Sequence, residues 1–335
     1  MKALITSALF VLAAAKVLSA QEESSLLPLT TTDVIVRVHP ESGTMETIPG
    51  VIRDIEGTLL TIQRSSSGKV TLLPLRQVTE IRYARTAAHD RAQGLMSDRK
   101  GWEPAATELE QALKHEPRQW AVREIHADMA RCMKHLRRYH RVTEEIETIL
   151  KSDPDTRHVT LLPLEWRTPR AEGASDDRTD VVPSDLSSPS IIRRLIAASV
   201  YLMNSPHSAA SRETLEQIRL SGRPRIQELA EVQLWRADVS GDEPLSDARM
   251  RLWRQRARDF DRTLRGPAEY LLGVALLKRH QPESAATCFL WQPLMSPEDP
   301  DLTVECFDQT IAALEASGQR NEAARIRSER DQEVK

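Results

Sequence analysis

Polar and apolar residues alternate with a period of two between Asp33 and Tyr83, and glycines interrupt this pattern. A period of two places every second side chain on one face of a β-strand. The pattern therefore predicts five short strands, at residues 33–38, 51–52, 59–62, 70–73 and 78–83. We expect the interrupting glycines to lie in turns, because turns favour residues that tolerate positive φ. These glycines are Gly43, Gly50, Gly57 and Gly68.

Short strands so close together are typical of a small closed or nearly closed barrel, here spanning residues 33–84. The run Gly50-Val-Ile-Arg-Asp-Ile-Glu-Gly57, followed by Leu60, Ile62 and a strand around Ile81, resembles small SH3-like and Sm-like barrels. Some barrels of this kind bind RNA. A fold does not by itself dictate a function, so we expect a small adaptor or docking module.

After Thr86 the apolar spacing becomes helical and stays helical to the C-terminus. Within residues 102–117, a small residue, a large apolar one, a second small one and a closing proline follow at helical spacing. They are Ala105, Leu109, Ala112 and Pro117. This order resembles the second helix of a tetratricopeptide repeat. A related unit closes at Pro154, a separation of 154 − 117 = 37 residues, near the ~34-residue period of that family.

The same resemblance returns towards the C-terminus. The matching residues are Leu272, Gly273, Ala285 and Phe289. A last unit places Gly318 five residues before Ala323. Two positions depart from the family pattern, since Val142 stands where a small residue is expected and Arg327 where an apolar one is expected.

The tetratricopeptide resemblance implies a mainly α fold, a TPR-like α–α superhelix preceded by the small all-β barrel module. It divides the helical part into one block at residues 86–166 and a second at 190–330. Between them, residues 167–189 are rich in proline, serine and aspartate without periodicity, which predicts a flexible linker.

The first twenty residues have the features of a secretory signal. Lys2 precedes a thirteen-residue uncharged stretch from Ala3 to Ala15, and small residues follow up to Ala20. Thirteen residues are too few to span a bilayer, which takes about 20. We therefore predict a signal peptide at residues 1–20 and an exported bacterial protein, periplasmic or secreted. Cleavage after Ala15, Ser19 or Ala20 and an uncleaved anchor all remain alternatives.

The charge balance changes the expected partners. The chain has 46 Lys and Arg against 49 Asp and Glu, a net charge of −3, so it has no general attraction for nucleic acid or anionic lipid. We expect no nucleic-acid partner and no membrane span after signal cleavage. A protein or peptide partner is expected instead. The three cysteines, Cys132, Cys288 and Cys306, are expected to be core residues, with a Cys288–Cys306 bridge as an alternative.

Catalytic and cofactor signatures are missing. No two glycines are closer than seven positions, as between Gly43 and Gly50, which excludes the dinucleotide fingerprint, the Walker loop and the nucleophile elbow. Cys132 and His135 would share a helix face, but no further cysteine or carboxylate completes a metal site with His126 or His140. We predict no catalytic residue, no cofactor and no metal.

An arginine row is the most regular polar feature. If residues 249–265 form one helix, Trp253, Ala257, Phe260 and Leu264 form an apolar stripe and the arginines face away from it. The row consists of Arg251, Arg254, Arg258, Arg262 and Arg265. Such a row binds carboxylates, sulfates or phosphates, or it is simply a solvated face.

Three functions are compatible with these patterns. The first is a non-enzymatic scaffold or protein-binding protein of the cell envelope, whose stacked repeats form a concave surface. The second is a binder of an anionic polymer, such as a polysaccharide, through the arginine row. The third and most remote is an enzyme whose site is built from residues distant in sequence.

Overall fold

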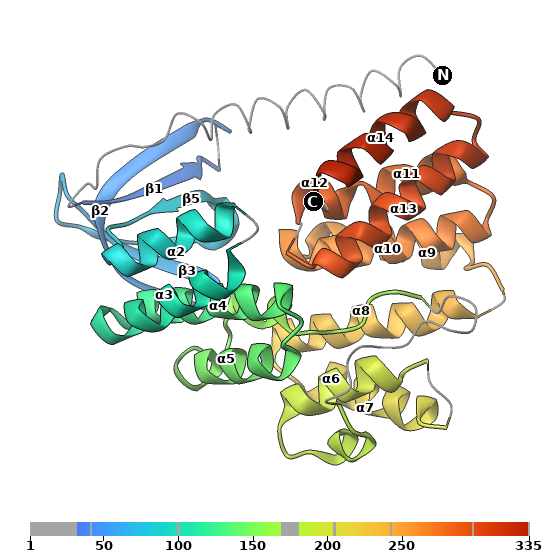
Figure 1. Ribbon diagram of the computed structural model, residues 1–335, viewed down its shortest axis with the longest axis horizontal. Coiled ribbons are helices and arrows are strands. Elements are labelled where there is room, and N and C mark those ends of the chain that lie inside the picture. The colour runs from blue at the N-terminus through green and yellow to red at the C-terminus, as the bar shows by residue number, and fades with distance from the viewer. Residues whose placement is uncertain are drawn as a thin grey trace. The chain divides into compact units, whose positions relative to one another are not determined.

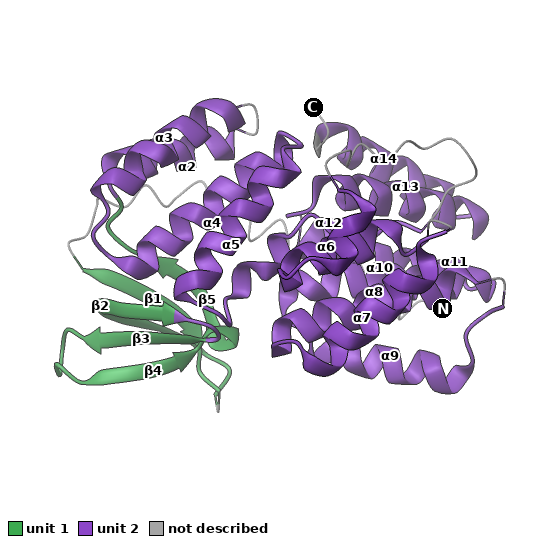
Figure 2. Ribbon diagram, turned by 90° about the horizontal axis from the view of Figure 1, so that it is seen from below, with its two compact units in different colours: residues 1–55, 59–85 green, residues 56–58, 86–335 purple. Residues whose placement is uncertain are grey.

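The computed structural model describes residues 32–40, 42–98, 101–168, 181–203, 206–241, 243–296 and 298–333. Two compact units divide the chain. Unit 1 contains the residues up to 55 together with 59–85, and unit 2 contains 56–58 together with the residues from 86 onwards. Figure 2 shows unit 1 as strands and unit 2 as helices. A mainly helical fold preceded by a small antiparallel sheet is thus confirmed.

Unit 1 is a five-stranded sheet with the order β4-β3-β2-β1-β5. Its strands are β1 (Asp33–Val38), β2 (Met45–Glu56), β3 (Leu59–Arg64), β4 (Val70–Pro74) and β5 (Val78–Arg82), with the 3-10 helix η1 (Leu75–Gln77) before β5. The pairings of β1 with β2, of β1 with β5 and of β3 with β4 are antiparallel. Alternate residues such as Ile48, Leu60 and Ile62 are buried, which gives the sheet its core face.

Gly50 corrects one expectation about the glycines. Gly43, Gly57 and Gly68 have positive φ and lie in turns, but Gly50 lies inside β2. A Cβ at Gly50 would stand 2.4 Å from the backbone oxygen of Gln63. Gly50 therefore serves the close approach of two strands, and β2 continues through a position where the sequence suggested a turn.

Unit 2 is built from helices that pack against their neighbours in the chain, as Figure 1 shows. The helices are α2 (Ala87–Ser97), α3 (Trp102–His115), α4 (Gln119–His135), α5 (Tyr139–Ser152), η2 (Arg157–Leu161), η3 (Pro183–Ser187), α6 (Ile191–Tyr201), α7 (Ser208–Ser221), α8 (Pro224–Ser240), α9 (Asp247–Asp259), α10 (Arg262–Lys278), α11 (Pro282–Phe289), α12 (Trp291–Met295), α13 (Pro300–Ala316) and α14 (Arg320–Glu333).

Three helix–turn–helix units have the same local geometry. Their first helices, α4, α10 and α13, each have 17 residues. Two residues beyond each helix end, Arg137, His280 and Gly318 adopt φ values of 57°, 55° and 81°. The following amide then donates back to the first helix: Arg138 to Met133, Gln281 to Leu276 and Gln319 to Leu314, at 2.8–3.0 Å. This left-handed cap reverses the chain into α5, α11 and α14.

Small residues allow the paired helices of unit 2 to approach closely. Ala105, Leu109 and Ala112 are fully buried on α3, whereas Pro117 is exposed just after that helix. On α10, Leu272 and Gly273 are buried, as are Ala285 and Phe289 on α11. The buried residues of this set fill the helix interfaces and present nothing to a ligand.

Two expected segments lie wholly or partly outside the described residues. The predicted signal peptide, residues 1–20, falls outside them, as does the part of the predicted linker at 169–180. The end of that linker forms η3, which packs against α6 and places Leu186 against the core. Among the described residues, none of the helices combines the length and apolarity that crossing a membrane requires.

Candidate functional site

The arginine row does not lie on one helix, which corrects the prediction for residues 249–265. α9 ends at Asp259, and Phe260 is extended with ψ of 150°. Asp261 then caps α10, since its side chain accepts a hydrogen bond from the Leu264 amide at 3.0 Å. An aspartate whose carboxylate satisfies the first free amides starts a new helix. The continuous row is therefore interrupted between Arg258 and Arg262.

The buried apolar stripe on the side opposite the arginines is retained across this break. Trp253, Ala257, Phe260 and Leu264 are all nearly inaccessible. The ring of Trp253 stacks on that of Trp235 of α8, with centroids 4.5 Å apart. α9 therefore buries this face and leaves the side chains of Arg251, Arg254 and Arg258 exposed.

The other two arginines of the row make internal contacts. Arg262 donates from Nε to the carbonyl oxygen of Met295. Arg265 pairs with Glu269 at 3.1 Å, and its guanidinium lies 3.8 Å from the ring centre of Trp291. Arg262 remains exposed and Arg265 is half-buried, and both guanidinium groups are engaged by groups of the same chain.

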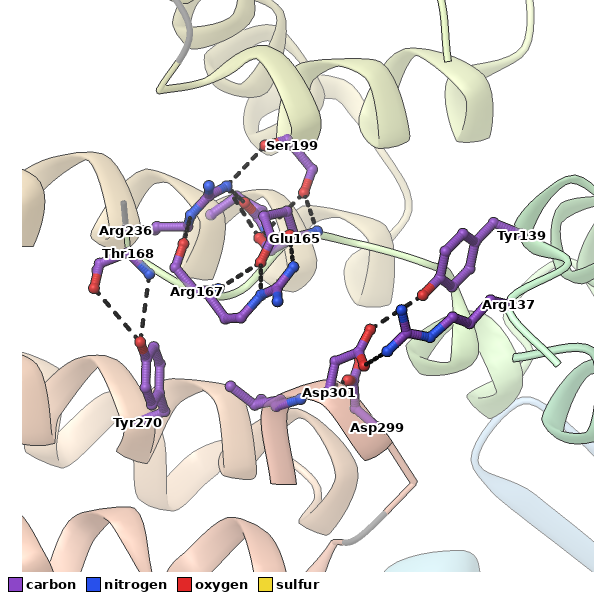
Figure 3. Close-up of polar contacts among 12 residues, drawn as sticks. Arg137, Tyr139, Glu165, Arg167, Thr168, Ser199, Arg236, Tyr270, Asp299 and Asp301 are labelled. Atoms are coloured by element: carbon purple, nitrogen blue, oxygen red, sulfur yellow. Dashed lines mark hydrogen bonds and ion pairs between the residues drawn. The ribbon is translucent and has the colours of Figure 1, made fainter. Parts of the chain in front are cut away.

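A buried polar network holds the extended segment after η2, as Figure 3 shows. Arg236 of α8 donates from Nη1 to the carbonyl oxygens of Glu165 and Ser199, at 3.0 and 2.7 Å. Its Nε donates to the carbonyl oxygen of Arg167 at 2.7 Å. Gln233 donates to Glu165 as well, at 2.9 Å. The network satisfies the backbone of a segment that belongs to no helix, which makes it structural.

Polar residues of α4, of the turn after it and of the start of α5 contact the N-terminal end of α13. The Lys134 amine lies 2.9 Å from Asp299, and both side chains are at most 10% exposed. Asp301 accepts from Arg137 at 3.2 Å and from the Tyr139 hydroxyl at 3.1 Å, contacts that Figure 3 also draws. These pairs join residues about 160 positions apart, and the Lys134–Asp299 pair is the more desolvated of them.

Glu124 of α4 is the most strongly perturbed carboxylate of this helix. It accepts from His158 at 3.1 Å and from Arg157 at 2.7 Å. Burial raises the pKa of the Glu124 carboxyl, but the nearby His158 and Arg157 outweigh burial and hold the pKa well below its ordinary value. Glu124 is therefore charged at neutral pH and acts as the counter-ion of η2.

Cys132, His135 and His126 of α4 lie in three different environments. Cys132 is fully buried in the core, and burial raises the pKa of its thiol to about 12. His135 stacks on Trp102 with ring centroids 3.7 Å apart. His126 lies 2.6 Å from a Glu145 oxygen. Over the described ranges, no three potential metal ligands come together.

A cavity of about 110 Å³ lies beside α5 and α6. Pro163, Val181 and Ile196 supply its apolar lining, and the polar groups around it include His140, Glu144 and Arg193. Pockets that enclose drug-sized ligands have volumes of about 300–1,000 Å³. This cavity therefore accommodates only a small group.

Exposed apolar side chains gather on the sheet of unit 1, a feature that sequence reasoning missed. Val51, Leu59, Val70 and Leu72 are 46%, 45%, 54% and 62% exposed. Leu72 pairs with Thr61 and Val70 with Gln63, so β4 alternates exposed and inward positions. The alternation in Val70-Thr-Leu-Leu-Pro74 is visible in the sequence, but which face is solvated depends on the sheet order.

No protein-family model matches this chain, and neither the curated proteins nor the solved structures include a match to it.

Proposed function

We propose that the chain is an exported, non-enzymatic scaffold of the cell envelope that binds other proteins through tetratricopeptide-like repeats. The observation that carries the proposal is the shared geometry of α4–α5, α10–α11 and α13–α14, with the same 17-residue first helix and the same left-handed cap. Repeated helix pairs of this kind stack into extended surfaces that bind proteins.

The packing residues support the same proposal. Val142, Ala285 and Ala323 each lie five positions after the capping residue of their unit, and each is buried. Small or β-branched residues at this point allow the second helix to lie close to the first. The five-stranded sheet before the helices is proposed to be a barrel-like docking module of SH3-like or Sm-like type.

The lack of catalytic chemistry is supported by how the reactive side chains are used. The thiols of Cys132 and Cys306 are fully buried, and burial raises the pKa of each. Glu124 and Asp299 are held by cations of the same chain. Groups occupied in this way stabilise the fold and are poorly placed for nucleophilic or acid–base work.

Partner capture from the envelope tests the proposal. Mature protein from residue 21 onwards is immobilised, exposed to envelope extract and cross-linked, and the cross-linked peptides are identified by mass spectrometry. We expect a stoichiometric protein partner cross-linked to α4, α10 or α13. A fusion of residues 1–20 to a reporter that is active only outside the cytoplasm tests export. Retention of no protein above a blank matrix would reject the scaffold.

An anionic polymer is the second candidate ligand, favoured by the exposed Arg251, Arg254 and Arg258 of α9. Their triple replacement by alanine is expected to abolish retention on a heparin column at moderate salt. The matched control replaces Arg219, Arg325 and Arg327, exposed arginines of α7 and α14, and removes the same charge. Equal elution of the two variants would exclude this ligand.

A further inference from the structure

The outer edge of the sheet formed by β4 has the features of a strand-binding site. β4 is an end strand in the order β4-β3-β2-β1-β5, and Figure 2 shows it beside β3 alone. It contains no charged residue. The side chains of Val70 and Leu72 are more than half exposed. An uncharged apolar edge strand is a template for pairing with another chain.

The hydrogen-bond register shows which backbone groups face outwards. The Arg64 amide donates to the Lys69 carbonyl at 3.0 Å, which makes these two residues a hydrogen-bonded pair. Bonded and non-bonded pairs alternate along an antiparallel ladder. The pairs Gln63–Val70, Thr61–Leu72 and Leu59–Pro74 are therefore non-bonded. The N–H and C=O groups of Val70 and Leu72 point away from β3.

Pro74 occupies the next outward position of the same edge. Proline has no N–H to offer, and it is tolerated where the ladder requires none. Two N–H donors and two carbonyl acceptors, those of Val70 and Leu72, are thus presented in line along β4, because Pro74 is the N-cap of η1 and its carbonyl accepts the first hydrogen bond of that helix. They come from the residues whose side chains form the exposed apolar surface.

The opposite edge of the sheet is different. Glu80 and Arg82 of β5 are exposed, and Arg82 donates to Glu80 at 2.5 and 2.7 Å. Charged side chains on an edge discourage strand addition. The sheet therefore protects β5 and leaves β4 accessible.

The charges around β4 indicate the kind of partner. Residues 59–76 include Arg64, Lys69 and Arg76 but no acidic residue. Lys69 and Arg76 are exposed just before and just after β4. If two copies of β4 paired antiparallel about Leu72, each copy would bring its Lys69 and Arg76 towards those of the other. Like-charge repulsion disfavours that pairing.

We propose that β4 binds an extended segment of a partner protein by strand addition. The segment has apolar residues at alternate positions and acidic residues at both ends. Its backbone bonds to the outward groups of Val70 and Leu72, its apolar side chains cover those of the same two residues, and its acidic ends lie near Lys69 and Arg76. This inference rests on the proposed function only in that the chain binds proteins, since it uses no part of the helical repeats.

A defined peptide tests the binding mode. The mature chain is titrated into the fluorescent peptide DEVTVTVTVED, with saturable binding followed by anisotropy. Successive residues of a strand direct their N–H groups to opposite edges. Two methylated peptides are therefore compared, one N-methylated at all valines and the other at all threonines. One of the two should bind at least tenfold more weakly than the unmethylated peptide, and the other should bind equally well. No saturable binding, or equal effects of the two methylated sets, would overturn strand addition.

Protein variants locate the site. Leu72→Lys should weaken binding at least tenfold, and Leu252→Lys, an equally exposed leucine on α9 (63%), should leave it unchanged. The peptide with lysines in place of its acidic ends should bind at least tenfold more weakly. Equal binding by the two variants would overturn the assignment to β4. Sedimentation that finds a dimer lost in Leu72→Lys would assign the edge to a second copy instead.

The outcome is separable from that of the scaffold test. If the peptide binds to β4 but the envelope yields no partner, the scaffold proposal fails and the edge site stands. If a partner cross-links to α4, α10 or α13 but the peptide does not bind, only the edge site fails.

Discussion

Gly273 of α10 lies directly against the ring of Phe289 of α11. A Cβ built on Gly273 would stand 2.6 Å from Cε1 of that ring, and Phe289 is completely buried. The ring cannot withdraw into solvent, so the distance between the two helices is set by the absence of one methyl group. This contact is part of the helix pairing on which the scaffold proposal depends.

Replacing Gly273 by alanine is expected to destabilise unit 2. Overpacking a buried contact costs about 1–3 kcal/mol, which outweighs the helix propensity gained. The matched control is Gly94→Ala in α2, where a Cβ meets nothing within 4 Å and a gain of about 0.5–1 kcal/mol is expected. Denaturant unfolding measures both. A neutral or stabilising Gly273→Ala would contradict the packing argument.

Part of this architecture was predictable from local sequence patterns. The period-two segment and the helical period after Thr86 predict a small sheet followed by helices, and the structure has both. Small residues at helical spacing, such as Ala105 and Ala112, are buried because the spacing itself places them on one face. These signals are local in sequence, so they do not depend on which helices or strands pack against each other.

The remaining features depend on contacts between distant segments. Arg236 reaches Glu165, which is 71 positions away, and no periodicity encodes that pairing. The break at Phe260 was missed because the apolar spacing continues through it, although Asp261 is a typical capping residue. The sequence predicts a turn at Gly50, because the pattern of the chain does not show that the Gln63 backbone approaches this glycine across the sheet.

Substitutions at the left-handed capping residues of α10 and α13 should change stability in opposite directions. His280 adopts φ of 55°, a conformation that costs a non-glycine residue about 1–2 kcal/mol. His280→Gly should therefore raise the thermal midpoint. At the equivalent position, Gly318→Ala should lower the thermal midpoint, with a loss of stability similar in size to the gain in His280→Gly. A Cβ at Gly318 meets nothing within 4 Å, so the loss comes from the backbone strain of an alanine at φ of 81°. Shifts of the same sign in both variants would refute equivalent caps.

The Lys134–Asp299 pair should contribute more than its exposed neighbour. Lys134→Met leaves the Asp299 charge buried and is expected to cost about 3–5 kcal/mol. Adding Asp299→Asn, which retains the cap on Leu302, should recover much of that loss. The exposed Arg137–Asp301 pair provides the control, with a coupling of about 0–1 kcal/mol. Double-mutant cycles in urea measure both couplings, and equal values would show that burial does not distinguish them.

Glu124 predicts an acid-dependent stability. Its pKa is held below the ordinary value of 4.5 in the folded state, so the folded protein keeps the carboxylate charged while the unfolded chain takes up a proton. The resulting stability is present above about pH 5 and is lost as the pH falls towards about 2. Glu124→Gln should unfold with a weaker pH dependence in this window. The exposed Glu110→Gln should retain the wild-type dependence, and identical profiles for all three proteins would contradict the assignment.

Arg236 tests whether the extended segment around Glu165 is held by one guanidinium. Its Nε and Nη1 donate to three carbonyl oxygens, those of Arg167, Glu165 and Ser199. A lysine carries the charge on a single nitrogen and cannot reproduce a fork of this width. At least one carbonyl then loses a charged donor, and each such bond is worth about 1.5–3 kcal/mol. Arg236→Lys should therefore lower stability by about 2–4 kcal/mol and expose Arg167 to trypsin in the native state.

The control is Arg212→Lys. Arg212 lies in a half-exposed ion pair with Asp238, so this substitution should change stability by less than about 0.5 kcal/mol. If Arg236→Lys unfolds like the wild type and resists trypsin at Arg167, the segment is held by its apolar neighbours and not by the guanidinium.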